Sequence, residues 1–145
     1  MFAKILLPTD GSAAVTAPMK AAIEFARLHD AQIVAVTVAE SLSSDPVADT
    51  LPAGQWRVYE DKLRELARRQ LMPVIEAAQE AGVTLDTVVA QGDAPAEKIL
   101  EVGREKGCDV IFIASHGRTG LDRLLMGSQT QKILRQSALP VLVFK

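Results

Sequence analysis

The 145-residue sequence predicts a doubly wound α/β fold, in which helices cover both faces of a five-stranded and mainly parallel sheet. Two observations predict it. Five short aliphatic runs are nearly continuous in hydrophobicity, as is typical of parallel strands covered on both faces. Helical patterns separate these runs, so four strand–helix units are followed by a last strand. We expect a single domain over residues 1–145, because this length suits one domain.

The predicted strands are rich in Val, Ile and Leu. They span residues 2–8, 31–39, 84–91, 109–115 and 140–144. Right-handed crossovers restrict the order in which such strands can pair. Both common doubly wound orders place the first strand beside a switch point, and ligands bind there beyond the carboxyl ends of the strands. The residues that follow the first and fourth strands are therefore the first candidates for a functional site.

Two helices are predicted in the first half of the chain. One spans residues 17–28, where Pro18 is tolerated because it falls in the first turn. The other spans residues 55–81, where the residues that follow the helical spacing are Tyr59, Leu63, Leu66, Gln70 and Pro73/Val74. Trp56 and Tyr59 open this helix and are expected to cover the core. Pro73 is expected to kink this helix or to break it.

Two further helices are predicted in the second half. Asp93 is a candidate N-cap for a helix over residues 94–106. Ser128 and Gln131 have the spacing of a capping box for a helix over residues 129–136.

Composition and charge exclude several classes of protein. Hydrophobic residues make up 48% and charged residues 23% of the chain, which is the balance of a globular protein. The 16 basic and 18 acidic residues give a net charge of −2, so the chain has no general attraction for nucleic acids or membranes. No apolar stretch approaches the roughly 18 residues of a membrane span, and no signal peptide is recognised. We expect a soluble protein.

Cys108 is the single cysteine, so an intramolecular disulfide, a CxxC motif and a thiolate zinc cluster are all excluded. This cysteine usage favours a reducing, cytoplasmic setting. Cys108 is expected to be a small buried residue rather than a nucleophile, since the sequence suggests no helper base.

The loop after the fourth predicted strand, "SHGRTGLDRLLMGS", is rich in glycine and positive charge. Its glycines would let a ligand approach the main chain, and a helix N-terminus at Ser128 would favour an anion. The residues that could form such a phosphate site are Gly117, Gly120, Gly127, Ser128, Arg118 and Arg123. The alternative is structural: the glycines form turns, Ser128 caps a helix and the arginines are solvated.

The first predicted strand is followed by "PTDGS", which contains Asp10. This carboxylate could accept hydrogen bonds from a ribose or help to hold a divalent metal through water. It could equally form an Asx turn that leads into the first helix. The sequence contains neither a GxxxxGK[ST] phosphate loop nor a GxGxxG dinucleotide motif.

Nearly the whole chain resembles the universal stress protein family. The matching segments are "ILLPTDGS", "QGDAPAEKIL", "GCDVIFIASHGRTGLDRLLMGSQTQKIL" and "LPVLVFK". The resemblance implies an adenine nucleotide alpha hydrolase-like sheet with strand order 3-2-1-4-5. Nucleotide-binding members have a glycine, two residues, a second glycine, nine residues and then Gly-Ser or Gly-Thr. Gly117, Gly127 and Ser128 match this pattern, whereas Ala114 replaces the first glycine.

The replacement by Ala114 costs little if the backbone φ there is negative, but it strains the end of the strand if φ is positive. The resemblance implies ATP binding, with adenine near the backbone of Val38 and the N–H of Gln129 on a phosphate. His116 either contacts the phosphates or completes a turn, and the structural role is favoured. The residues predicted to contact the nucleotide are Pro8, Thr9, Asp10, Val38, Ala114, His116, Gly117, Arg118, Gly120, Gly127, Ser128 and Gln129.

The predicted function is that of an ATP-binding stress-response regulator. Mg²⁺ could accompany the ATP, but the sequence does not specify which metal ion is bound. No nucleophile–base pair is evident, so at most slow ATP hydrolysis is expected. The alternative is a universal stress protein that binds no nucleotide and acts through protein partners, and Ala114 favours this alternative. The exposed edge of the last strand and the family resemblance both predict a homodimer through Val141–Lys145.

Overall fold

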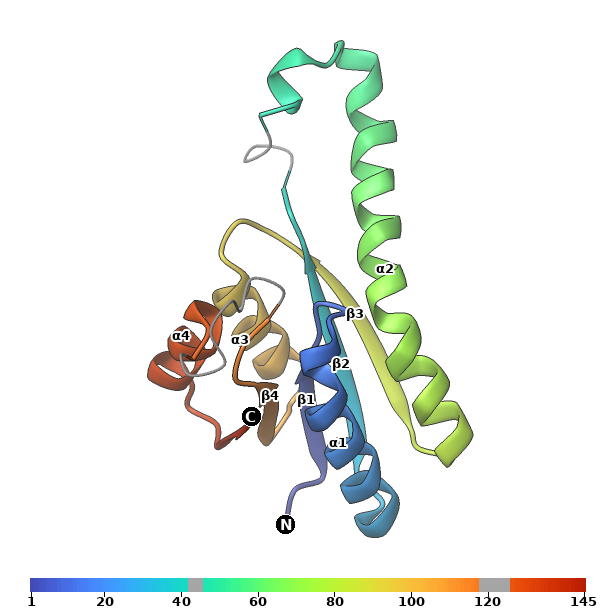
Figure 1. The fold of residues 1–145 in the computed structure, drawn as a ribbon, viewed down its shortest axis with the longest axis vertical. Coiled ribbons are helices and arrows are strands. Elements are labelled where there is room, and N and C mark those ends of the chain that lie inside the picture. Colours follow the sequence, from blue (N-terminus) through green and yellow to red (C-terminus); the bar gives the residue numbers. More distant parts are fainter. Residues whose placement is uncertain (42–45, 118–125) are drawn as a thin grey trace.

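The five strands form one sheet with the order β3-β2-β1-β4-β5, and every neighbouring pair is parallel (Figure 1). The computed structural model describes residues 1–41, 46–117 and 126–145. The strands are β1 (Lys4–Pro8), β2 (Gln32–Ala39), β3 (Leu85–Gln91), β4 (Val110–Ala114) and β5 (Val141–Phe144). The predicted fold class and strand order are therefore confirmed.

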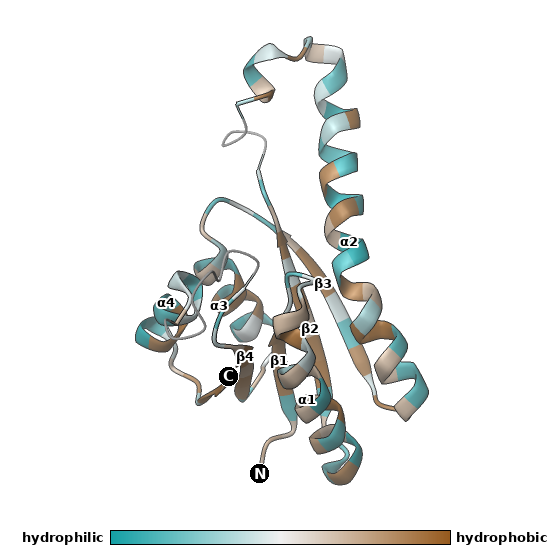
Figure 2. Cartoon of the chain, in the orientation of Figure 1, coloured by the Kyte–Doolittle hydropathy of each residue, from teal (hydrophilic) through white to brown (hydrophobic). Residues whose placement is uncertain are grey.

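The helices pack on the sheet in two layers. One layer contains α1 (Thr16–His29) and α2 (Trp56–Ala81), and the other contains α3 (Pro95–Glu105) and α4 (Ser128–Gln136). In the described residues, short 3-10 helices lie in the connections, namely η1 (Ala13–Val15), η3 (Ala48–Thr50) and η4 (Ala53–Gln55). Figure 2 shows apolar strands enclosed by helices that are hydrophilic on their outer sides.

The sheet has a hydrophobic core on each face. In β1, Ile5 and Leu7 join the core beneath α1 and α2, whereas Leu6 joins the core beneath α3 and α4. Because successive side chains of a strand point to opposite faces, both sets must be apolar when both faces are covered. This is the physical reason for the nearly continuous hydrophobic runs in the sequence.

Helix α2 extends well beyond the end of the sheet (Figure 1). Its buried residues begin only at Ala67, and they are Ala67, Leu71, Val74 and Ala78. Trp56 is 50% exposed, so the prediction that it covers the core is wrong. Pro73 lies inside the continuous helix on an exposed position, so the predicted break does not occur. Proline lacks an N–H and therefore removes one helical hydrogen bond. At an exposed position, water can bind the carbonyl that loses this bond.

Both predicted helix caps are wrong. Ala94 occupies the N-cap position of α3, while Asp93 accepts a 2.7 Å hydrogen bond from the Ser41 hydroxyl. Ser128 is the first residue of α4 and Gly127 is its N-cap, with no side-chain capping bond. Gln131 uses its side-chain amide to donate to the Met126 carbonyl at 2.9 Å. In both places contacts with neighbouring segments replace the local cap.

Within the described ranges, no helix combines the length and the apolar character that crossing a membrane requires.

Candidate functional site

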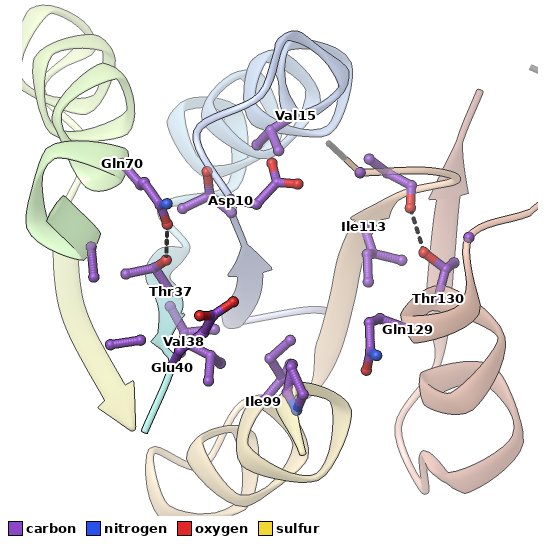
Figure 3. A pocket seen from close by; sticks show the side chains of 18 of the residues that line it. Asp10, Val15, Thr37, Val38, Glu40, Gln70, Ile99, Ile113, Gln129 and Thr130 are labelled. Carbon is purple, nitrogen blue, oxygen red and sulfur yellow. Dashed lines mark hydrogen bonds between the residues drawn. The ribbon is translucent and has the colours of Figure 1, made fainter. Parts of the chain in front are cut away.

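A cleft of about 560 Å³ opens at the carboxyl ends of β1, β2 and β4. Helix α2 forms one wall, and the first turns of α3 and α4 form the other (Figure 3). Strand β1 is the central strand of the sheet. The chain first adds β2 and β3 on one side of β1, and it then adds β4 and β5 on the other side. The cleft therefore lies at the switch point of the sheet, where doubly wound folds bind their ligands.

The loops that follow β1 and β4 approach each other closely at Asp10 and Gly117. The backbone N–H of Ser12 donates a 2.9 Å hydrogen bond to Oδ1 of Asp10, so the predicted Asx turn is present. A methyl group at Gly117 would lie 2.7 Å from Oδ2 of the same carboxylate. Gly117 is thus needed for close approach, and its absent side chain leaves the Asp10 carboxylate at the cleft surface.

Ala114 ends β4 without backbone strain. Among the described residues other than glycine, only Asp30 has a positive φ, so Ala114 has an ordinary strand conformation. Its carbonyl accepts a 2.8 Å hydrogen bond from the hydroxyl of Thr130 in α4. The replacement of the first motif glycine by alanine therefore does not distort the strand end. Ala114 does line the cleft.

Helix α4 begins at the cleft, directly after Gly127. The N–H of Gly127 donates a 2.6 Å hydrogen bond to the Ser115 carbonyl, and a Cβ at Gly127 would lie 3.3 Å from Cα of His116. Any side chain here would crowd the loop after β4. The N–H groups of Ser128, Gln129 and Thr130 belong to the first turn and have no partner within the helix. They give this end of the cleft a partial positive charge.

Gln129 also joins α4 to α3. Its side-chain Oε1 accepts a 3.1 Å hydrogen bond from the N–H of Ala96, in the first turn of α3. This contact leaves the backbone N–H of Gln129 at the cleft. The first turns of the two helices are therefore held side by side along one wall.

The backbone of Val38 faces the cleft because β2 is longer than β1. In the pairing of β1 with β2, Val36 lies opposite Pro8, which is the last residue of β1. The Val36 carbonyl accepts a hydrogen bond from the N–H of Thr9. The carbonyl of Ala39 instead accepts from Gly92, on the β3 side. Since main-chain groups alternate along a strand, the N–H and C=O of Val38 point toward β1, which has already ended. One donor and one acceptor are thus presented side by side.

The structure brings together most of the predicted contact residues. Those that line the cleft are Thr9, Asp10, Val38, Ala114, His116, Gly117, Gly127, Ser128 and Gln129. Pro8 is not among the lining residues, because it is buried at the end of β1. Arg118 and Gly120 fall outside the described residues, as does Arg123.

Sequence reasoning missed the wall formed by α2 and the polar residues near the end of β2. Leu63, Leu66 and Gln70 follow the helical spacing but line the cleft instead of the core. Thr37 and Glu40, close in sequence to Val38, also line it. Their proximity to Val38 was the available signal for the β2 residues. No comparable signal marked the α2 residues, because a cleft wall and a core stripe share the same spacing.

Few ionisable side chains line the cleft in the part of the chain that the structure describes. They are Asp10, Glu40 and His116, and the described lining contains neither Lys nor Arg. Nδ1 of His116 lies 3.0 Å from the Ser115 hydroxyl, which matches its role in completing the turn. No group of three potential metal ligands occurs within the described ranges. Cys108 lies away from the cleft and is buried, and this burial raises its thiol pKa to about 11.

These features define a doubly wound α/β protein with an open cleft at its switch point. The sequence matches the universal stress protein family over residues 1–145, and the chain belongs to this family. It is 33% identical to universal stress protein MJ0531 of Methanocaldococcus jannaschii over 145 residues, which cover all of this chain and 83% of that protein.

Solved structures of the family share the fold. The structure of MJ0577, also a universal stress protein of M. jannaschii, superposes with a TM-score of 0.82 at 26% identity and covers all of this chain and 96% of its own. The universal stress protein of Archaeoglobus fulgidus in complex with dAMP has a TM-score of 0.70 at 16% identity, covering 98% of this chain and 97% of that one.

Proposed function

We propose that the protein binds an adenine nucleotide in the cleft and acts as a homodimeric, ATP-responsive regulator in the cytoplasm. The observation that carries the proposal is the backbone pair of Val38, placed across the cleft from the first turn of α4. One end of the cleft can recognise a base, and the other can hold an anion.

The Val38 backbone suits adenine in particular. Adenine presents an acceptor at N1 beside a donor at its 6-amino group, which complements the N–H and C=O of one strand residue. Apolar side chains from both walls, including Leu66 and Ile99, would cover the two faces of the base.

The first turn of α4 suits the phosphates. Gly117 and Gly127 let the ligand reach the main chain, and the N–H groups of Ser128 and Gln129 are donors for phosphate oxygens. Asp10 lies between the two ends, where it can accept from a ribose hydroxyl. Mg²⁺ is commonly held by one or two carboxylates together with substrate phosphates, and Asp10 could provide such a carboxylate.

A relative supports nucleotide binding as a property of this family. The A. fulgidus protein was solved in complex with dAMP, and another universal stress protein of the same fold was solved in complex with cAMP. The alternative, a member that acts through protein partners without nucleotide, rested on Ala114. The unstrained backbone at Ala114 supports the nucleotide-binding proposal over this alternative.

We further propose that β5 pairs with the β5 of a second copy. Among the described strands, β5 is an edge of the sheet with β4 as its one neighbour, and Leu142 is 39% exposed. Twofold antiparallel pairing of Val141–Lys145 would cover the edge.

Thermal unfolding with ATP and Mg²⁺ tests the nucleotide proposal. A ligand at about 100 times its dissociation constant stabilises the folded state by about 2.7 kcal/mol, so the midpoint should rise with ATP concentration. Gly127→Asp should abolish the rise, because it places a carboxylate beside the proposed phosphate position and crowds the His116 backbone. The oligomeric state of the variant, measured by light scattering, should match that of the native protein. An unchanged midpoint for the native protein at millimolar ATP would refute the proposal.

A further inference from the structure

Glu40 is a charged side chain at the base end of the cleft, and the nucleotide proposal does not use it. It lies one residue beyond β2 and lines the cleft together with Val38 (Figure 3). Residues two apart in a strand direct their side chains to the same face. Val38 packs against the core beneath α3 and α4, and the exposed side chain of Glu40, two residues further along, lines the same cleft as Val38 and Ile99.

The position of Glu40 relative to the Val38 backbone suggests its role. An adenine held by Val38 donates one hydrogen of its 6-amino group to the Val38 carbonyl and has a second hydrogen left over. An ionised carboxylate is an acceptor only, so it can accept this second hydrogen but cannot satisfy a keto oxygen. A hydrogen bond to an ionised group is also stronger than a neutral one.

The charge distribution of the cleft favours the same orientation. Glu40 would repel phosphates, whereas the first turn of α4 attracts them. The described lining contains no Lys or Arg that could neutralise Glu40. A nucleotide bound in the opposite direction would place its phosphates against this carboxylate.

We infer that Glu40 is a specificity-determining residue, which selects bases with an exocyclic amino group beside a ring acceptor by accepting the amino hydrogen that Val38 leaves unused. This inference rests on the proposed function, because it assigns a role within the same nucleotide site.

The test compares two ligands that differ only in the amino group. ATP and purine riboside triphosphate share the N1 acceptor, but the second has hydrogen in place of the 6-amino group. Their dissociation constants with Mg²⁺ are measured by calorimetry for the native protein, Glu40→Ala and Glu40→Gln. Glu76→Gln is the matched control, because it removes a carboxylate from an exposed position of α2 outside the cleft.

The native protein and Glu76→Gln should prefer ATP by the same ratio. In Glu40→Ala this ratio should fall by about tenfold, which corresponds to about 1.4 kcal/mol, and in Glu40→Gln it should fall less. A neutral amide oxygen can still accept the hydrogen, so the glutamine variant separates hydrogen bonding from a loss of packing. Affinity for purine riboside triphosphate should not decrease in either variant.

The possible outcomes distinguish the role of Glu40 from nucleotide binding itself. If ATP binds and its preference over purine riboside triphosphate does not depend on residue 40, the inference is overturned and nucleotide binding stands. If neither triphosphate binds the native protein, both are overturned.

Discussion

The hydroxyl of Thr37 donates a 2.6 Å hydrogen bond to Oε1 of Gln70, and this bond joins β2 to the wall of the cleft formed by α2 (Figure 3). Thr37 is only 2% exposed, so water cannot replace its partner. Gln70 also packs against the backbone at Gly11, whose φ of 75° and missing side chain allow the contact. One glutamine therefore positions α2 against two segments that border the cleft.

Gln70→Leu is expected to destabilise the protein by roughly 1–3 kcal/mol, because it leaves a buried hydroxyl without a partner. Urea unfolding measures the effect. The double variant Thr37→Val with Gln70→Leu should recover much of the lost stability, since it also removes the Thr37 hydroxyl that has no partner. If the single and double variants are equally stable, this hydrogen bond does not stabilise the fold.

Gly117→Ala should weaken ATP binding by at least about tenfold, or about 1.4 kcal/mol, while the fold remains intact. The new methyl group would lie 2.7 Å from Oδ2 of Asp10, so the carboxylate must move away from the proposed ribose position. The φ of Gly117 is not positive, and alanine is therefore compatible with the backbone. Gly54→Ala is the matched control, because a Cβ there meets no atom within 4 Å. Calorimetric titration that gave equal affinities for the two variants would contradict the assigned position of Asp10.

The sequence predicted the sheet well because the physical cause is simple. Two covered faces require strands such as β1 to be apolar throughout, and right-handed crossovers leave few orders for five strands. The loops of the site were also predictable, since the end of β1 carries Asp10 and the end of β4 leads to Gly117. Topology alone brings these loops together.

The remaining wall could not be predicted, for a reason visible in α2. Leu63 and Leu66 are apolar and follow the helical spacing, yet the sheet ends before it reaches them and they border the cleft instead. The length of the sheet relative to the helix depends on tertiary packing, which periodicity does not record. The prediction that Asp93 caps α3 was wrong for a similar reason. Its carboxylate accepts a hydrogen bond from the hydroxyl of Ser41, which is distant in sequence.

Cys108 should react slowly with alkylating reagents in the folded protein. Burial raises the pKa of its thiol to about 11, so little of the reactive thiolate is present at pH 9. Iodoacetamide labelling at that pH, followed by mass spectrometry, should be at least about tenfold slower than in denaturing urea, where the thiol has its ordinary pKa near 9.0. Equal rates would show that Cys108 is accessible.

The same pKa shift has a consequence for stability with a definite sign. The folded state holds the thiol proton more tightly than the unfolded state, so this contribution is complete below about pH 9 and is lost as the pH rises toward 11. Unfolding free energies at pH 8 and pH 10.5 should therefore differ more for the native protein than for Cys108→Ala. The opposite order would mean that burial does not govern the thiol.

The edge of β5 offers a substitution that separates pairing within the sheet from pairing between copies. The carbonyls of Pro140 and Phe144 accept from Ile111 and Ser115. Because main-chain groups alternate along the strand, Leu142 also faces β4, whereas Val143 directs its N–H toward the open edge. A proline at Val143 removes a donor that only a second copy would use, and edge strands tolerate proline on their outer side.

Val143→Pro should therefore be a folded monomer under conditions in which the native protein is a dimer, as measured by light scattering and circular dichroism. Val143→Ala keeps the N–H and removes a similar amount of packing, so it should remain dimeric. Leu142→Pro removes a donor that β4 uses and should reduce thermal stability instead. If Val143→Pro stays dimeric, the two copies meet through another surface, and a monomeric native protein would refute the dimer altogether.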